Sequence, residues 1–146
     1  MAYQVSIFLE NKIGHLERVT AVLKAAQINI RTMNLTHTTS GWGILNLVVS
    51  DPELAHRLLN ENRLSAALRE IVVIEMPDQP GGLDELLKKI IAAGVNFTNA
   101  YGRSGYDSEN AYFVIDTEDV PDACRKLQEV GLSLLSDHTI YGIPGN

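Results

Sequence analysis

The sequence predicts an α+β protein built from two ferredoxin-like βαββαβ units in tandem, each an antiparallel sheet with both helices on one face. The main observation is an internal repeat. Residues 11–16 (NKIGHL) return as 78–83 (DQPGGL), and residues 25–30 (AAQINI) return as 92–97 (AAGVNF), both at an offset of 67 residues. Self-similarity at a fixed period indicates a duplicated supersecondary unit, so the repeat sets the architecture.

The first copy opens with a strand, because residues 3–9 mostly alternate between apolar and polar types. A polar turn at 11–14 leads to apolar residues at helical spacing from 16 to 26. A strand at 28–38 follows, and Gly41 and Gly43 predict a hairpin at 39–43 before the next strand at 44–49. Asp51 as cap and Pro52 at the first position start a helix that ends near Asn62, and a fourth strand occupies 64–69.

The second copy repeats this order. A strand at 71–76 and a turn at 77–82 precede a helix with one apolar face, made by Leu83, Leu86, Leu87, Ile90 and Ile91. The remaining predicted elements are a strand at 95–101, a polar loop at 102–110, a strand at 111–116, a helix at 120–130, one or two last strands within 132–143, and a tail at 144–146. Gly131 is expected to close the last helix as a left-handed cap.

We expect two domains, residues 1–69 and 70–146, out of 146 residues in all. No linker rich in Gly, Ser or Pro separates them, and the last strand of the first copy runs almost directly into the first strand of the second. A unit of about 70 residues buries only a limited core, so the two copies are expected to share surface.

Composition excludes several classes of function. The chain is 45% apolar and 21% charged, which is typical of a soluble globular protein. A net charge of −6 with scattered Lys and Arg argues against nucleic-acid binding. Neither a membrane-spanning run of about 20 apolar residues nor a secretion signal is visible. Because Cys124 is the only cysteine, no internal disulfide can form, which indicates a cytoplasmic protein.

The turn between the first strand and the first helix of each copy is a candidate binding site. A helix begins with N–H groups that lack partners and with a partial positive charge, so it attracts a carboxylate. Gly14 and Gly81 leave the backbone accessible, while Asn11 and Asp78 can accept a hydrogen bond from an ammonium group. These features suit a small zwitterion. For either turn taken alone, the alternative is a purely structural cap.

The pattern polar-x-Pro-Gly-x-Leu, then a helix, then Gly-Val/Ile-Asn-Ile/Phe, resembles that of ACT domains, which are small-ligand regulatory modules of amino-acid metabolism. The resemblance covers nearly the whole chain as two copies without a catalytic domain, as in the stand-alone tandem ACT proteins of bacteria. It implies amino-acid ligands at interfaces between ACT units, where the turn of one unit faces the second strand of a neighbour. The first turn departs from this pattern at Ile13, which stands where the pattern has Pro. His15 follows the glycine of this turn.

Carried over by position, the resemblance implies ligand-binding residues in the two turns and at the two strand starts. These are Asn11, Ile13, Gly14, His15, Leu16, Asn29, Ile30, Asp78, Pro80, Gly81, Gly82, Leu83, Asn96 and Phe97. Because the first turn lacks Pro, the two sites are expected to differ, and the second fits the pattern better. The identity of the amino acid stays open.

The function we expect is therefore that of an amino-acid-binding regulatory, allosteric protein, and not of an enzyme. The alternative is an interaction subunit that docks on a biosynthetic enzyme and binds nothing small. The expected partners are a free amino acid, a second copy in a homodimer, and an amino-acid biosynthetic enzyme. Neither a cofactor nor a metal is expected, since no nucleophile–base pair or cofactor loop occurs and the histidines lack metal-binding spacing: His15, His37, His56 and His138.

Overall fold

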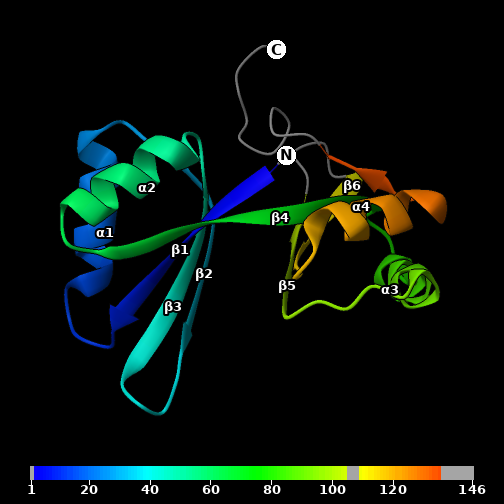
Figure 1. The fold of residues 1–146 in the computed structure, drawn as a ribbon, viewed down its shortest axis with the longest axis horizontal. Coiled ribbons are helices and arrows are strands. Elements are labelled where there is room, and N and C mark those ends of the chain that lie inside the picture. The colour runs from blue at the N-terminus through cyan, green and yellow to red at the C-terminus, as the bar shows by residue number, and fades with distance from the viewer. Residues whose placement is uncertain (1, 105–108, 136–146) are drawn as a thin grey trace. The chain divides into compact units, whose positions relative to one another are not determined.

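The structure, a computed structural model, describes residues 2–104 and 109–135. These residues form two compact units (Figure 1). The first unit is Tyr3–Arg69, and the second contains 70–135 together with Ala2.

The first unit has the predicted βαββαβ order. Its elements are β1 (Ala2–Glu10), α1 (His15–Ala25), β2 (Ile30–His37), β3 (Trp42–Val49), α2 (Pro52–Glu61) and the first part of β4 (Ser65–Pro77). The strand order is β2-β3-β1-β4, so the first and last strands lie next to each other in the sheet. The antiparallel register places Val5 opposite Leu47 and Ile7 opposite Leu45.

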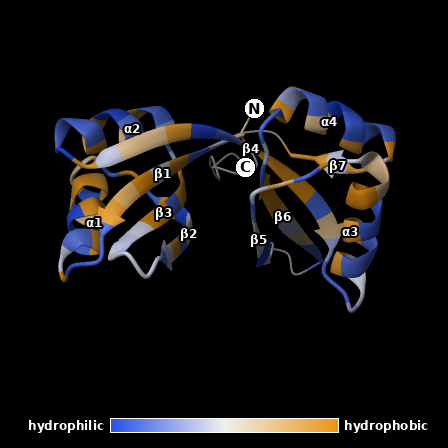
Figure 2. Cartoon of the chain, turned by 60° about the horizontal axis from the view of Figure 1, so that its bottom comes forward, coloured by the Kyte–Doolittle hydropathy of each residue, from blue (hydrophilic) through white to orange (hydrophobic). Residues whose placement is uncertain are grey.

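Alternate residues of the strands build the core of the first unit. Val5, Ile7 and Leu9 of β1 are buried in one cluster with Leu23 of α1 and Leu59 of α2. Since residues of one strand that are two apart share a face, both helices cover the same side of the sheet. Figure 2 shows apolar residues on the sheet and on the helix surfaces that face it. This arrangement confirms the predicted fold class.

The helix-free face of the first unit carries two aromatic residues. The rings of Phe8 and Trp42 stack with their centroids 4.7 Å apart and their planes inclined by 5°. Beside them, the hydroxyl of Ser6 donates a 2.6 Å hydrogen bond to Oδ1 of Asn46. Phe8, Trp42 and Ile44 all remain substantially exposed.

The second unit repeats the architecture. Its elements are the second part of β4, α3 (Gly82–Ala93), β5 (Asn99–Ser104), β6 (Asn110–Asp116), α4 (Val120–Glu129) and β7 (Ser133–Leu134). β4 pairs with both β6 and β7, and β5 pairs with β6, all antiparallel. The core joins alternate strand residues to both helices, as in the first unit: Val72, Ile74, Leu86, Ile90, Phe113, Ile115 and Leu127 are among its members.

Three local predictions need correction or extension. The expected strands at 64–69 and 71–76 are one strand, β4, because no Gly or Pro interrupts the backbone between Ser65 and Met76. The expected loop at 102–110 begins later, since β5 continues to Ser104. The predicted last strand is represented by β7, and what was expected beyond 135, including the tail at 144–146, lies outside the described residues.

The predicted apolar face of α3 is only partly buried. Leu86 and Ile90 are buried, but Leu83 is 44% and Ile91 is 76% exposed. The core of this unit needs only a narrow stripe of α3, and residues 83 and 91 lie to one side of that stripe.

Candidate ligand-binding site

In both units, the turn that follows the first strand is tied to a neighbouring hairpin. The N–H group of Asn11 donates to the carbonyl oxygen of Gly41 at 2.7 Å. At the position 67 residues later, the N–H group of Asp78 donates to the carbonyl oxygen of Glu109 at 3.0 Å. The side chains of Asn11 and Asp78 are exposed, so each offers a polar atom at the rim of its turn.

The two turns also share their glycine conformation. Gly14 has φ of +88° and Gly81 has φ of +83°, and each occupies the N-cap position of the following helix. Left-handed backbone of this kind is accessible to glycine at little cost. In each turn, the N–H group of the residue after the glycine donates a hydrogen bond within the turn. His15 donates to the carbonyl oxygen of Lys12, and Gly82 donates to the carbonyl oxygen of Gln79. The two turns therefore have the same pattern of backbone hydrogen bonds.

Helices α1 and α3, which follow the two turns, begin differently from α2 and α4. Asp51 caps α2 by accepting a hydrogen bond from the N–H of Leu54, and Asp119 caps α4 by accepting one from the N–H of Asp122. In the described part of the chain, no side chain caps α1 or α3. The openings of α1 and α3 thus retain N–H groups for an external acceptor, such as a carboxylate.

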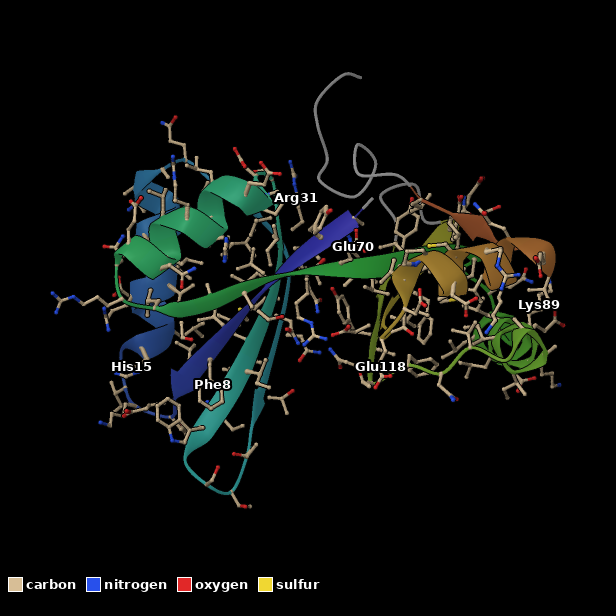
Figure 3. All side chains as sticks on the ribbon, in the orientation of Figure 1. Phe8, His15, Arg31, Glu70, Lys89 and Glu118 are labelled. Carbon is tan, nitrogen blue, oxygen red and sulfur yellow. The ribbon has the colours of Figure 1, made fainter. Side chains whose placement is uncertain are left out.

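The opening of α1 is surrounded mainly by basic groups. Lys12, His15 and Arg18 all lie within its turn and first helical turn, with Glu17 among them. Lys12 pairs with Glu10 at 2.6 Å, and this hydrogen bond lowers the pKa of the Glu10 carboxyl. Ile13 is fully exposed, and Leu16 packs partly against the core. Figure 3 shows His15 next to the start of the helix.

The opening of α3 is more acidic. Asp78, Asp84 and Glu85 lie around it, and Asp84 pairs with Lys88 at 2.9 Å. A hollow of about 200 Å³ lies beside the turn, and Gly82 is part of its lining. Pro80, Gly81 and Leu83 are exposed at the turn, whereas Gly82 is buried. The two openings therefore share their backbone conformation but differ in the charged side chains around them.

Asn29 and Ile30, the predicted strand-start residues of the first unit, already make contacts within that unit. The backbone of Asn29 makes two hydrogen bonds with Ser50, both of 2.9 Å. Ile30 is partly buried and packs against the core, so it offers only part of its surface. The Asn29 side chain itself is exposed.

In the second unit the corresponding segment borders a hollow of about 280 Å³, near the lower end of the size range of small-molecule sites. Asn96 and Phe97 form one wall, and helix α4 forms another through Asp119 and Asp122 at its start and Lys126 in its last turn. Thr117 donates to the carbonyl of Asn96 at 2.9 Å, while the Phe97 ring packs edge-on against Phe113 at 6.0 Å. In the sequence, Asp119 and Asp122 stand at the start of a helix, where acidic residues are common. These acidic residues line the hollow only because α4 lies next to the strand start, and the repeat does not predict this packing.

A single unit does not bring all its predicted site residues together. The turn lies at the N-terminal end of the helix, and the strand start lies beyond its C-terminal end. Helix α1 has 11 residues and α3 has 12, so about 16–18 Å of helix separates the two groups. In each unit, the predicted site residues therefore fall into two groups at opposite ends of the helix.

Among residues 2–104 and 109–135, no group of three or more His, Cys, Asp or Glu side chains is arranged to hold a metal ion. No helix in that part of the chain is long and apolar enough to cross a membrane. Burial raises the pKa of Tyr101 above its usual range, and the nearby carboxylate of Asp116 adds to the effect.

Comparison with known proteins identifies the family. A sequence model described as "ACT domain pair" matches residues 1–140. The chain belongs to the ACT domain pair family. No curated protein matches it at a significant level.

Among solved structures, this ACT domain pair is similar to the crystal structure of protein BT0572 from Bacteroides thetaiotaomicron. The two are 32% identical, with 97% of this chain and 96% of that chain covered and a TM-score of 0.88. The regulatory subunits of aspartate kinase from Thermus thermophilus and Thermus flavus share the fold. They are 13% and 15% identical, with TM-scores of 0.63 and 0.59 and with 88% of this chain and 91% of each of theirs covered.

Proposed function

We propose that this ACT domain pair is a regulatory protein of amino-acid metabolism that binds a free amino acid, and that it is not an enzyme. Membership in the family supports the regulatory role. So does the similarity of fold to proteins described as regulatory subunits of aspartate kinase. The observation that carries the ligand proposal is the contrast between helices: α2 and α4 are capped by aspartates, while α1 and α3 begin at left-handed glycines without a side-chain cap.

In the proposed complex, the ligand carboxylate accepts hydrogen bonds from the opening of α1 or α3. The ammonium group meets Asn11 or Asp78 at the rim of the turn. Asp78 can form a charge-assisted hydrogen bond, whereas Asn11 offers a neutral oxygen. The basic surroundings of α1 favour the carboxylate end, and the acidic surroundings of α3 favour the ammonium end. The two openings would therefore bind with different affinity.

The test is calorimetric titration and thermal melting with each common amino acid. At least one should bind and raise the melting temperature by mass action. Asp78→Ala removes only the side chain, because the backbone bond to Glu109 is retained. It should weaken binding roughly tenfold or more at the α3 opening, the effect of losing a hydrogen bond to a charged group. Asn11→Ala tests the α1 opening in the same way, and Asp78→Asn is the matched control that keeps an oxygen but loses the charge.

If no amino acid shifts the melting temperature at millimolar concentration, the ligand proposal fails. The alternative is an interaction subunit that docks on a biosynthetic enzyme. The exposed, stacked Phe8 and Trp42 favour this role, because large exposed aromatic residues are typical of protein interfaces. Recovery of a bound enzyme that is lost in Trp42→Ala, with no response to amino acids, would support the alternative.

A further inference from the structure

The hollow of about 280 Å³ beside Asn96 is built by the second unit alone. Its walls are the segment before β5, the connection between β6 and α4, and α4 itself. Two threonine hydroxyls tie the first two walls together. Thr117 donates to the carbonyl oxygen of Asn96 at 2.9 Å, and Thr98 donates to the carbonyl oxygen of Asp116 at 3.3 Å. The hollow therefore forms within one unit and is braced by that unit's own hydrogen bonds.

The first unit has apolar side chains at the equivalent positions of its helix. The helix caps align the two units, because Leu54 and Asp122 each donate their N–H group to the capping aspartate. By this alignment, Asp122 stands where the first unit has Leu54. One turn further, Lys126 stands where it has Leu58. Both leucines are partly buried and pack against the core, whereas Asp122 and Lys126 line the hollow. The fold accepts leucine here, so the charged lining is a property of the second copy.

The charged groups of the hollow fall into a paired and an unpaired set. Asp122 accepts hydrogen bonds from Lys126 and Arg125, both at 2.7 Å, so its charge is compensated within α4. Asp119 accepts the backbone N–H of Asp122 but keeps its full charge. Within the described part of the chain, neither Glu118 nor Asp119 makes an ion pair. The hollow therefore carries an excess of negative charge.

The wall opposite α4 is aromatic. Phe97 is 38% exposed, and its ring packs against Phe113 in a T-shaped pair with the centroids 6.0 Å apart. Carboxylates beside an aromatic ring suit an organic cation, because the carboxylates accept charge-assisted hydrogen bonds and the ring attracts a cation and contacts its apolar part. A metal ion fits less well, since no three acidic, His or Cys side chains of residues 2–104 and 109–135 are arranged to hold one.

We propose that this hollow binds a small organic cation, namely a primary amine or guanidinium on a short apolar group. The cationic group binds Glu118 and Asp119, and the apolar part packs against Phe97. The ion pair between Asp122 and Lys126 stays intact. The site uses neither the turn at Asp78 nor a second unit, so it is separate from the amino-acid site proposed above.

Titration with 2-phenylethylamine, followed by amide chemical shifts, tests the site. The amine should shift the signals of residues 94–98 and 117–126. The alcohol 2-phenylethanol has a similar shape without the charge and should bind at least tenfold more weakly. Glu118→Gln should weaken amine binding roughly tenfold, the effect of losing a hydrogen bond between charged groups. Asp78→Ala should bind the amine as the wild type does. Equal binding of alcohol and amine, or an equal loss in Asp78→Ala and Glu118→Gln, would overturn the proposal.

Filling the hollow is a second test. The double variant Asp122→Leu, Lys126→Leu carries the residues of the first unit at these positions, so it should fold and lose amine binding. The matched control is Arg57→Leu, Glu61→Leu, which removes a pair with the same spacing from α2 and also adds two leucines. It should bind the amine as the wild type does. Unchanged binding in the filled variant, or no shift in the wild type at millimolar amine, would overturn the proposal.

Discussion

A Cβ atom on Gly82 would lie 2.6 Å from the carbonyl oxygen of Pro77, closer than side chains approach backbone. The end of β4 thus presses directly on the first residue of α3. The equivalent residue of the first unit is His15, which has a side chain at this position. The second turn is therefore tighter than the first, although the two share their hydrogen bonds.

Gly82→Ala should lower the free energy of unfolding by about 1–3 kcal/mol, because the methyl group meets rigid backbone. Urea denaturation measures the change. His15→Ala is the matched control, and it should stay within about 0.5 kcal/mol of the wild type. Equal effects of the two substitutions would show that the close approach to Pro77 does not constrain the turn.

Gly14→Ala and Gly81→Ala should each cost about 1–2 kcal/mol, because both glycines have positive φ and an L side chain is strained there. No atom lies within 4 Å of either added Cβ, so the cost would come from the backbone alone. Gly102 also has open space but no positive φ, and Gly102→Ala should be close to neutral. Thermal melting of the three variants separates these cases.

Removal of a helix cap should destabilise the chain modestly. Asp51→Ala and Asp119→Ala each delete a side chain that accepts a backbone N–H bond, which costs about 1 kcal/mol. Asp51→Asn and Asp119→Asn keep a capping oxygen and should lose much less. If the alanine and asparagine variants unfold at the same urea concentration, the aspartates do not act as caps.

Cys124 should react slowly with alkylating reagents. Burial raises the pKa of its thiol, and the negative charge of Glu70 adds to the effect. The reactive thiolate therefore forms at higher pH in the folded chain than in urea, where the midpoint should be about 8.5. The alkylation rate plotted against pH shows both midpoints, and coincident curves would contradict the shift.

The same shift affects stability in a defined direction. The folded chain holds the thiol proton more tightly than the unfolded chain. The contribution of Cys124 to stability is therefore complete below the ordinary thiol pKa and declines as the pH rises through the folded value. Cys124→Ser should flatten this alkaline decline.

Much of the fold could be predicted from the repeat and from periodicity. The alternation in residues 3–9, the Asp-Pro helix start at Asp51 and the left-handed Gly131 are local signals, and each has the predicted structure. The junction between the copies was predicted as two strands, because a boundary between repeats suggests a break. The sequence between Ser65 and Met76 contains no Gly or Pro that would force a break, and pairing with neighbouring strands keeps the backbone extended.

The candidate site was predictable only in part. The turns could be located because Gly14 and Gly81 mark left-handed backbone at a helix start. The exposure of Leu83 and Ile91 could not be predicted, since periodicity does not tell how wide a stripe the core covers. Likewise, the hollow beside Asn96 depends on the three-dimensional packing of α4 next to the start of β5, which no local pattern encodes.

The shared strand β4 has a consequence for how the gene can change. A protein made by duplication can often lose a copy or be split into two chains. Here the boundary between Arg69 and Glu70 falls inside a continuous strand, so cutting the chain there would leave both fragments with a severed β-strand. A deletion that removes one copy must therefore also supply a new end for this strand, which makes loss of a copy costly for the copy that remains.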